Sequence, residues 1–109
     1  MLSHLLLFVL FVAGVSTRSP LGKHILQVQA RDEDAIGAGI VRYSVMGGHM
    51  DTTNKKTLFD IQPTLGIVTN VELMGKYANR VFSIIVNARD AEDPAQAESG
   101  NITVRVCVK

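Results

Sequence analysis

Three aspartates offer the clearest chemistry in this sequence. Asp32 and Asp34 form an Asp-x-Asp pair directly after one apolar segment, and Asp90 follows another. Alternate residues of an extended segment share a face, so the pair sends both carboxylates to the same side. Calcium takes roughly six to eight oxygen ligands, chiefly carboxylates and backbone carbonyls. The three acids, with a carbonyl of the glycine-rich turn near Ala38, are therefore a candidate calcium site, and solvated surface acids are the competing interpretation.

Other reactive side chains are sparse. His24 and His49 lack a Cys or Ser set in a recognisable nucleophile motif, so we predict no enzyme and no small-molecule substrate. A single cysteine with scattered histidines is not a transition-metal site, and His49-Met50-Asp51 is interpreted as a polar loop. Cys107 has no partner for a disulfide within the chain. It is either an inert strand residue or a free thiol able to pair with another chain.

Length and charge limit the class of protein. The chain has 109 residues, of which 47% are hydrophobic, and a formal net charge of +1. This is enough for one globular domain and is not the composition of a disordered chain. A nearly neutral chain also argues against nucleic acid or an anionic membrane as a partner, because both favour a concentrated basic surface. The basic doublet Lys55-Lys56 is interpreted as part of a solvated loop.

The segments that must position the acids alternate in hydrophobicity with a period of two, which predicts β-strands with one buried face. The apolar members of four such stripes are Leu26, Val28 and Ala30; Val41, Tyr43 and Val45; Phe82, Ile84, Val86 and Ala88; and Ile102, Val104, Val106 and Val108. Shorter strands are predicted at 59–61 and 67–71, and no segment predicts an amphipathic helix. The pattern predicts an all-β, antiparallel sandwich. If the strands before Asp32 and Asp90 are neighbours running the same way, the acids meet at one end.

The first residues have two interpretations. Leu5–Val12 is an apolar run followed by small residues, which resembles a secretory signal peptide cleaved after Gly14 or Ser16. The run is too short for a transmembrane helix, which takes about 20 apolar residues. The alternative is that residues 1–16 contain the first strand of the fold, or are an arbitrary start on a fragment of a longer chain. In either case we expect the main body of the domain at residues 17–109.

Three segments resemble the repeated extracellular domain of cadherins. Ala30–Asp34 (ARDED) resembles the A-x-D-x-D segment of that family. Phe59–Gly66 (FDIQPTLG) resembles its F-x-I-D-x-x-T-G turn, from which Gln62 and Leu65 depart, and Phe82–Asp90 matches Y-x-L-x-V-x-A-x-D. The matches fall in order along the chain. The chain is identified as a single, partly degenerate cadherin repeat, which implies a seven-stranded Greek-key, immunoglobulin-like β-sandwich.

The resemblance implies a role for each acid. Asp32 and Asp34 fall on the A-x-D-x-D acids and Asp90 on the A-x-D acid, which in the family bind calcium at the amino-terminal pole together with the preceding repeat. Ala38 stands where the family often has Asn, whose main-chain oxygen is the ligand, so its backbone carbonyl remains a candidate ligand. These oxygens alone do not fill calcium's shell. An isolated repeat is therefore expected to bind weakly, with a Kd no tighter than about 10⁻⁴–10⁻³ M.

The carboxyl-terminal pole departs from the family. Thr17, Gly75 and Tyr77 stand where the family has the acids of its second calcium half-site. The sequence also stops at Lys109, where the family's acidic linker would begin. The resemblance therefore implies that the downstream calcium half-site is missing.

Two functions are compatible with these residues. The resemblance implies a calcium-binding module of homophilic cell–cell adhesion, whose partners are other cadherin repeats in the same chain or on opposing cells. Its location is then the cell surface, through a larger multi-repeat parent at the plasma membrane, or the secreted fraction if the chain is complete. Asn101-Ile102-Thr103, an N-glycosylation sequon where a loop enters the last predicted strand, fits an extracellular location. The alternative is a calcium-independent, immunoglobulin-like sandwich serving as a structural or protein-interaction domain.

Overall fold

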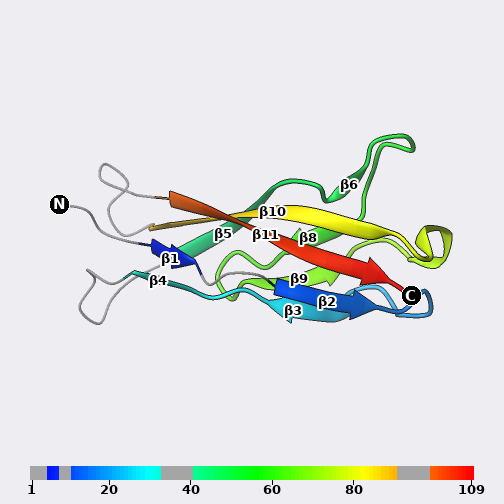
Figure 1. Ribbon diagram of the computed structural model, residues 1–109, viewed down its shortest axis with the longest axis horizontal. Coiled ribbons are helices and arrows are strands. Elements are labelled where there is room, and N and C mark those ends of the chain that lie inside the picture. The colour runs from blue at the N-terminus through cyan, green and yellow to red at the C-terminus, as the bar shows by residue number, and fades with distance from the viewer. Residues whose placement is uncertain (1–4, 8–10, 33–40, 91–98) are drawn as a thin grey trace.

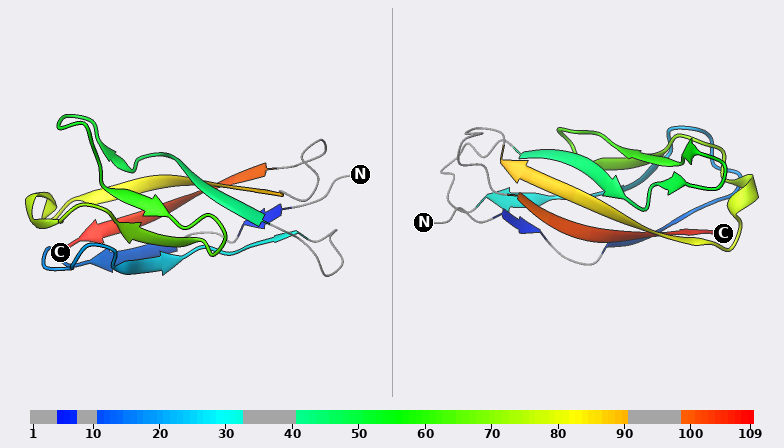
Figure 2. Two further views of the ribbon diagram at one scale, coloured as in Figure 1. Left: turned by 180° about the vertical axis from the view of Figure 1, so that it is seen from behind. Right: turned by 90° about the horizontal axis from the view of Figure 1, so that it is seen from above.

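The computed structural model describes residues 5–7, 11–32, 41–90 and 99–109, with side chains at 12–29, 41–89 and 100–109 (Figure 1). Seven strands form two sheets that face each other (Figure 1, Figure 2). The larger sheet has the order β2 (Phe11–Val15), β11 (Ser99–Val108), β10 (Val81–Asp90) and β5 (Val41–Gly47). The smaller sheet has the order β3 (His24–Gln27), β9 (Ile67–Asn70) and β8 (Phe59–Ile61). The described residues therefore confirm the predicted seven-stranded β-sandwich.

Two short strand pairs accompany these sheets. β1 (Leu5–Leu7) pairs antiparallel with β4 (Ala30–Asp32), and β6 (Met50–Asp51) pairs antiparallel with β7 (Lys56–Thr57). The helical element of the described residues is a single turn of 3-10 helix, η1 (Gly75–Tyr77). No helix in this part of the chain is long and apolar enough to cross a membrane.

β10 and β11 supply much of the core through strict alternation. They pair antiparallel along almost their whole length, with Ile84 opposite Val104. Both of these side chains are fully buried, whereas Ser83, between two buried residues of β10, faces solvent. Phe59 of the facing sheet packs edge-on against Phe82, with ring centroids 5.3 Å apart. Because successive side chains of a strand point to opposite faces, this burial pattern confirms the predicted apolar stripes.

The predicted strand through Leu26 and Ala30 is interrupted. β3 ends at Gln27, and the amide of Val28 instead donates to the carbonyl of Gly66, at 2.8 Å. Gly66 has a φ of +73°, and a Cβ at this position would collide with the Val28 carbonyl oxygen. The close approach of the Val28 and Gly66 backbones therefore requires glycine. The chain resumes as β4, which pairs with β1 and not with the three-stranded sheet.

β2 pairs in parallel with β11, whereas the sequence pattern predicts antiparallel pairing. Val15 at its end is 4% exposed and belongs to the core, and Val12 on the opposite face is 60% exposed. The amide of Lys109 donates to the Val15 carbonyl at 3.0 Å, which closes this end of the sheet. β2 therefore covers the outer edge of β11. Removal of residues 1–16 as a signal peptide stays a prediction.

The two valines of β2 provide a matched test of this strand. Val15→Ala should lower the free energy of unfolding by about 2 kcal/mol, because it removes buried methyl groups and leaves a cavity. Val12→Ala should change it by less than about 0.5 kcal/mol, because Val12 is exposed. Urea unfolding of the full chain measures both values. Equal effects of the two substitutions would contradict the inclusion of β2 in the folded sandwich.

Candidate functional site

The ends of β4 and β10 lie at the same end of the sandwich, which we call the acidic pole (the backbone positions of Asp32 and Asp90). Each strand ends on its aspartate. Asp90 pairs with Val41, the first residue of β5, and β4 contacts β5. Figure 1 and Figure 2 show both strand ends away from the C-terminus of the chain. Two predicted calcium ligands are thus placed at one pole at the level of the backbone.

The sequence predicts that the acids converge if the strands that precede them are neighbours running the same way. The two strands that end at the acidic pole do not pair with each other. β10 belongs to the four-stranded sheet, and β4 follows β3, which belongs to the facing sheet. β4 itself pairs with β1, and its contact with β5, the neighbour of β10, brings the two strand ends to the same pole. Asp34 and Ala38 lie outside the described residues, and of Asp32 and Asp90 only the backbone is described.

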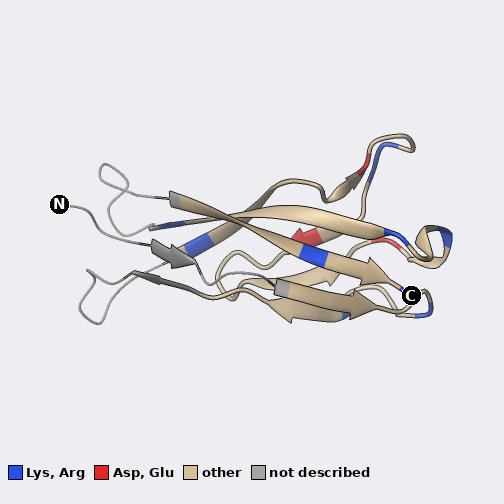
Figure 3. Ribbon diagram, in the orientation of Figure 1, with Lys and Arg blue, Asp and Glu red and all other residues tan. Residues whose placement is uncertain are grey.

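The donor set at the acidic pole fits calcium, whose ligands in proteins are mostly carboxylate and carbonyl oxygens. Two arginines lie close by: Arg42 of β5 pairs with Arg89 of β10, one residue before Asp90 (Figure 3). Their positive charges oppose the binding of a cation at this pole. Among the residues whose side chains are described, no three His, Cys, Asp or Glu side chains gather into a metal site.

The opposite pole (Thr17, Gly75 and Tyr77) carries the three residues that replace the acids of the second half-site. Gly75 and Tyr77 form η1, and the amide of Thr17 donates to the Lys109 carbonyl at 3.0 Å. The Tyr77 side chain is 3% exposed, and its ring packs edge-on against Phe82 with centroids 5.9 Å apart. Tyr77 is therefore a core residue that also closes this end of the sandwich.

The interpretation of His49-Met50-Asp51 as a polar loop is wrong. The segment contains β6, and Asp51 is 7% exposed. Its carboxylate accepts hydrogen bonds from the Tyr77 hydroxyl and from Asn54 Nδ2, each at 2.7 Å. The backbone amides of Thr53 and Asn54 donate to the same carboxylate. These bonds tie the β6–β7 turn to η1, so the role of Asp51 is structural.

The Asp51 hydrogen bonds shift two pKa values. The side-chain amide of Asn54, followed by the Tyr77 hydroxyl, stabilises the carboxylate and lowers the pKa of Asp51 to about 2. The bond to Asp51 raises the pKa of Tyr77, because an ionised Tyr77 has no proton to donate. The partners are 26 residues apart, so no local pattern predicts their contact. The sequence did offer a signal for the β6–β7 turn, because Asp51 and Asn54 are of residue types that favour turns.

Asp51 gives the stability of the fold a defined pH dependence. Its pKa is about 2 in the folded chain and 3.8 ordinarily, so its contribution is fully present above about pH 4 and is lost as the pH falls towards 2. Asp51→Asn should lower stability at neutral pH and make the loss between about pH 4 and about pH 2 less steep. Urea unfolding at these pH values measures this, with Asp60→Asn, at an exposed position of β8, as the control. Equal pH slopes for the parent and Asp51→Asn would contradict this role.

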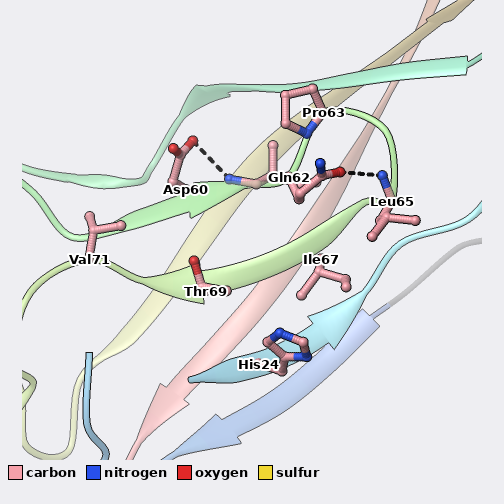
Figure 4. Close-up of a pocket in the computed structure, with 9 residues that line it drawn as sticks. His24, Asp60, Gln62, Pro63, Leu65, Ile67, Thr69 and Val71 are labelled. Carbon is pink, nitrogen blue, oxygen red and sulfur yellow. Dashed lines mark hydrogen bonds between the residues drawn. The ribbon is translucent and has the colours of Figure 1, made fainter. Parts of the chain in front are cut away.

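An open groove of about 430 Å³ lies on the outer face of the three-stranded sheet (Figure 4). Most of its lining is apolar, and its titratable residues are His24 and Asp60. The Asp60 carboxylate accepts a hydrogen bond from the Ile61 amide, and the Gln62 side chain accepts one from the Leu65 amide. These polar side chains are therefore engaged by the neighbouring backbone, and the groove holds no arrangement of a nucleophile with a base.

Asn101 lies inside β11 and not at a loop boundary as the sequence predicts. β11 begins at Ser99, two residues before it, and Asn101 pairs with Asn87 of β10. The Asn101 side chain is exposed on the outer face of the four-stranded sheet.

Known proteins are similar to this chain in sequence and in fold. A family model of the cadherin domain matches residues 11–107. Protocadherin-23 of Homo sapiens is 28% identical over 97 residues, which cover 89% of this chain and 3% of that protein. Cadherin-7 of Gallus gallus is 29% identical over 97 residues, covering 89% of this chain and 12% of that protein. The solved structure "Protocadherin Gamma B2 extracellular cadherin domains 3-6" has a TM-score of 0.81 at 22% identity, covering 98% of this chain and 25% of that chain.

The family match and the solved structure agree with the architecture. The matched residues run from the start of β2 to the penultimate residue of β11, so they include all seven strands of the two sheets. The chain spans only a small part of the length of the curated relatives that it matches. The chain belongs to the cadherin domain family, whose members are adhesion proteins and not enzymes.

Proposed function

We propose that this chain is a calcium-binding, extracellular cadherin repeat from a larger multi-repeat protein that acts in homophilic cell–cell adhesion. The observation that supports calcium binding most directly is that β4 and β10 both end on aspartates at the acidic pole. Membership of the cadherin domain family supports a role in adhesion. The solved relative, by its own description, consists of extracellular domains, which supports the proposed location.

The ligands of the proposed half-site are the carboxylates of Asp32, Asp34 and Asp90 and the backbone carbonyl of Ala38. Carboxylates held at one pole repel each other, and a divalent cation among them replaces repulsion with attraction. These oxygens are fewer than the roughly six to eight that calcium takes, so a preceding repeat or water completes the shell. For the isolated repeat the proposed Kd is therefore about 10⁻⁴–10⁻³ M.

The proposed partners are other cadherin repeats, in the same chain or on opposing cells. A calcium ion whose ligands come from two successive repeats restrains their relative orientation, because both repeats must keep their oxygens within about 2.3–2.6 Å of one ion. Such restraint removes conformational freedom before adhesion takes place, which lowers the entropic cost of binding between opposing chains. The parent chain would hold this repeat at the plasma membrane.

The residues of the opposite pole support the proposal that calcium binds at the acidic pole only. Thr17, Gly75 and Tyr77 offer no carboxylate, and the Tyr77 hydroxyl donates to Asp51 inside the chain. The same observation favours a second candidate function, in which the chain is a calcium-independent sandwich with a structural or protein-interaction role. The two candidates differ in whether calcium stabilises the folded chain.

Calcium titration of the full chain separates the two candidates. With one site of Kd about 1 mM, calcium at about 10 mM should add about 1.4 kcal/mol to the free energy of unfolding and raise Tm by about 5 °C. The double variant Asp32→Ala, Asp90→Ala should lose this rise. Asp60→Ala, which removes an exposed acid from the face of β8, should keep it. Calorimetric unfolding in calcium and in chelator measures all three proteins.

Two results would contradict the proposed half-site. Identical unfolding curves of the parent in calcium and in chelator would favour the second candidate, a structural or protein-interaction role without calcium. A calcium-dependent rise that persists in the double variant would mean that the cation binds away from the acidic pole.

A further inference from the structure

The outer face of the four-stranded sheet presents an acceptor for a sugar chain. Asn101 and Thr103 lie two residues apart on β11, so both side chains project from the outer face. Both are exposed, and the residue between them, Ile102, packs against the core. The arrangement places the amide and the hydroxyl of the Asn-x-Thr sequon on the same solvent-facing surface.

The hydrogen bonds of Asn101 leave its nitrogen available. Asn87 Nδ2 donates to the Gly100 carbonyl at 3.5 Å and to Asn101 Oδ1 at 2.9 Å. The Gly100 carbonyl can only accept, so it sets the orientation of the Asn87 amide, which in turn selects the oxygen of Asn101 as its partner. Asn101 Nδ2 makes no hydrogen bond within the described part of the chain, and the Asn101 side chain is exposed. This nitrogen is the atom that N-glycosylation modifies.

We propose that Asn101 carries an N-linked oligosaccharide, and that this glycan closes the outer face of the four-stranded sheet to protein partners. The proposal rests on the extracellular location proposed above. The donor is a lipid-pyrophosphate-linked oligosaccharide. Asn101 Nδ2 forms a bond to C1 of the first sugar and loses one proton to water. The bond from C1 to the phosphate oxygen breaks, and the lipid pyrophosphate leaves with the electron pair.

The position of Asn101 on the sheet determines what the glycan covers. Thr103, next to it on the outer face, lies opposite Ile85 of β10, which is 40% exposed. Without a cover, this part of the face presents an apolar side chain to solvent. The facing sheet has no sequon, and its outer surface carries the apolar groove, with Leu65 at 54% exposure (Figure 4). The glycan therefore leaves the three-stranded face as the surface open to protein contact.

Secretion of the full chain from mammalian cells, behind an added cleavable signal peptide, tests the modification. Enzymatic removal of N-linked glycans should increase the electrophoretic mobility of the parent and of Thr103→Ser, which keeps the sequon. It should leave Thr103→Ala unchanged, because that substitution removes the sequon but keeps the contact of Asn101 with Asn87. Because the added signal peptide directs secretion whatever the native location, an unglycosylated parent would contradict the glycan proposal alone. It would not bear on the proposed function.

Thiol labelling tests the closure of the face. In a Cys107→Ser background, Ile85→Cys reports on the outer face of the four-stranded sheet and Leu65→Cys on the opposite face. A maleimide attached to a large polymer should react several-fold more slowly with the Ile85→Cys protein when the sequon is intact than when it carries Thr103→Ala. The rate for the Leu65→Cys protein should be the same in both. The proposal is overturned if the parent carries no glycan. It is also overturned if the glycan leaves both labelling rates unchanged, or slows labelling at positions 85 and 65 equally.

Discussion

The pairing of β10 with β11 is the interaction on which the rest of the structure depends. Their inward side chains, such as Ile84 and Val104, form the centre of the core, and burial of apolar surface is the dominant stabilising term in folding. β5 attaches to β10, β2 attaches to β11, and Phe59 brings the facing sheet against Phe82. The same register carries β10 to its end at the acidic pole and places Asn101 on the outer face. A slip of one residue would turn every one of these side chains to the wrong side.

The two poles of the sandwich differ in chemistry. At the acidic pole, β4 ends on Asp32 and β10 ends on Asp90. At the opposite pole, the Asp51 carboxylate is held by hydrogen bonds from Tyr77 and Asn54 within the chain. An acid whose oxygens are engaged in this way stabilises the fold instead of binding a shared cation. The two poles therefore differ in the described residues, and the proposed calcium ligands belong to one of them.

Period-two hydrophobicity was sufficient to predict β5, β10 and β11 and their buried faces, because each inward side chain must be apolar for the two sheets to pack. Three features escaped prediction because they depend on contacts between distant residues. β3 ends after Gln27 because the Val28 amide donates to the Gly66 carbonyl. β2 pairs in parallel with the edge of β11 that does not pair with β10. The Asp51–Tyr77 bond joins residues 26 positions apart. For the candidate site, the sequence predicts that Asp32 and Asp90 lie at one end, and the described backbone of both strand ends does so. It does not predict that the chain leaves the three-stranded sheet after β3 and pairs with β1 as β4. The calcium ligands themselves stay a prediction.

We propose that one pole of this repeat binds calcium and that the other does not. The most direct measurement is a calcium titration of the isotopically labelled full chain, followed through its backbone amide NMR signals. We expect saturable shifts, with a midpoint of about 0.1–1 mM, at the amides of Asp32 and Asp90, and no comparable shifts at Thr17 and Tyr77. Unchanged spectra, or shifts centred on Thr17 and Tyr77, would contradict it.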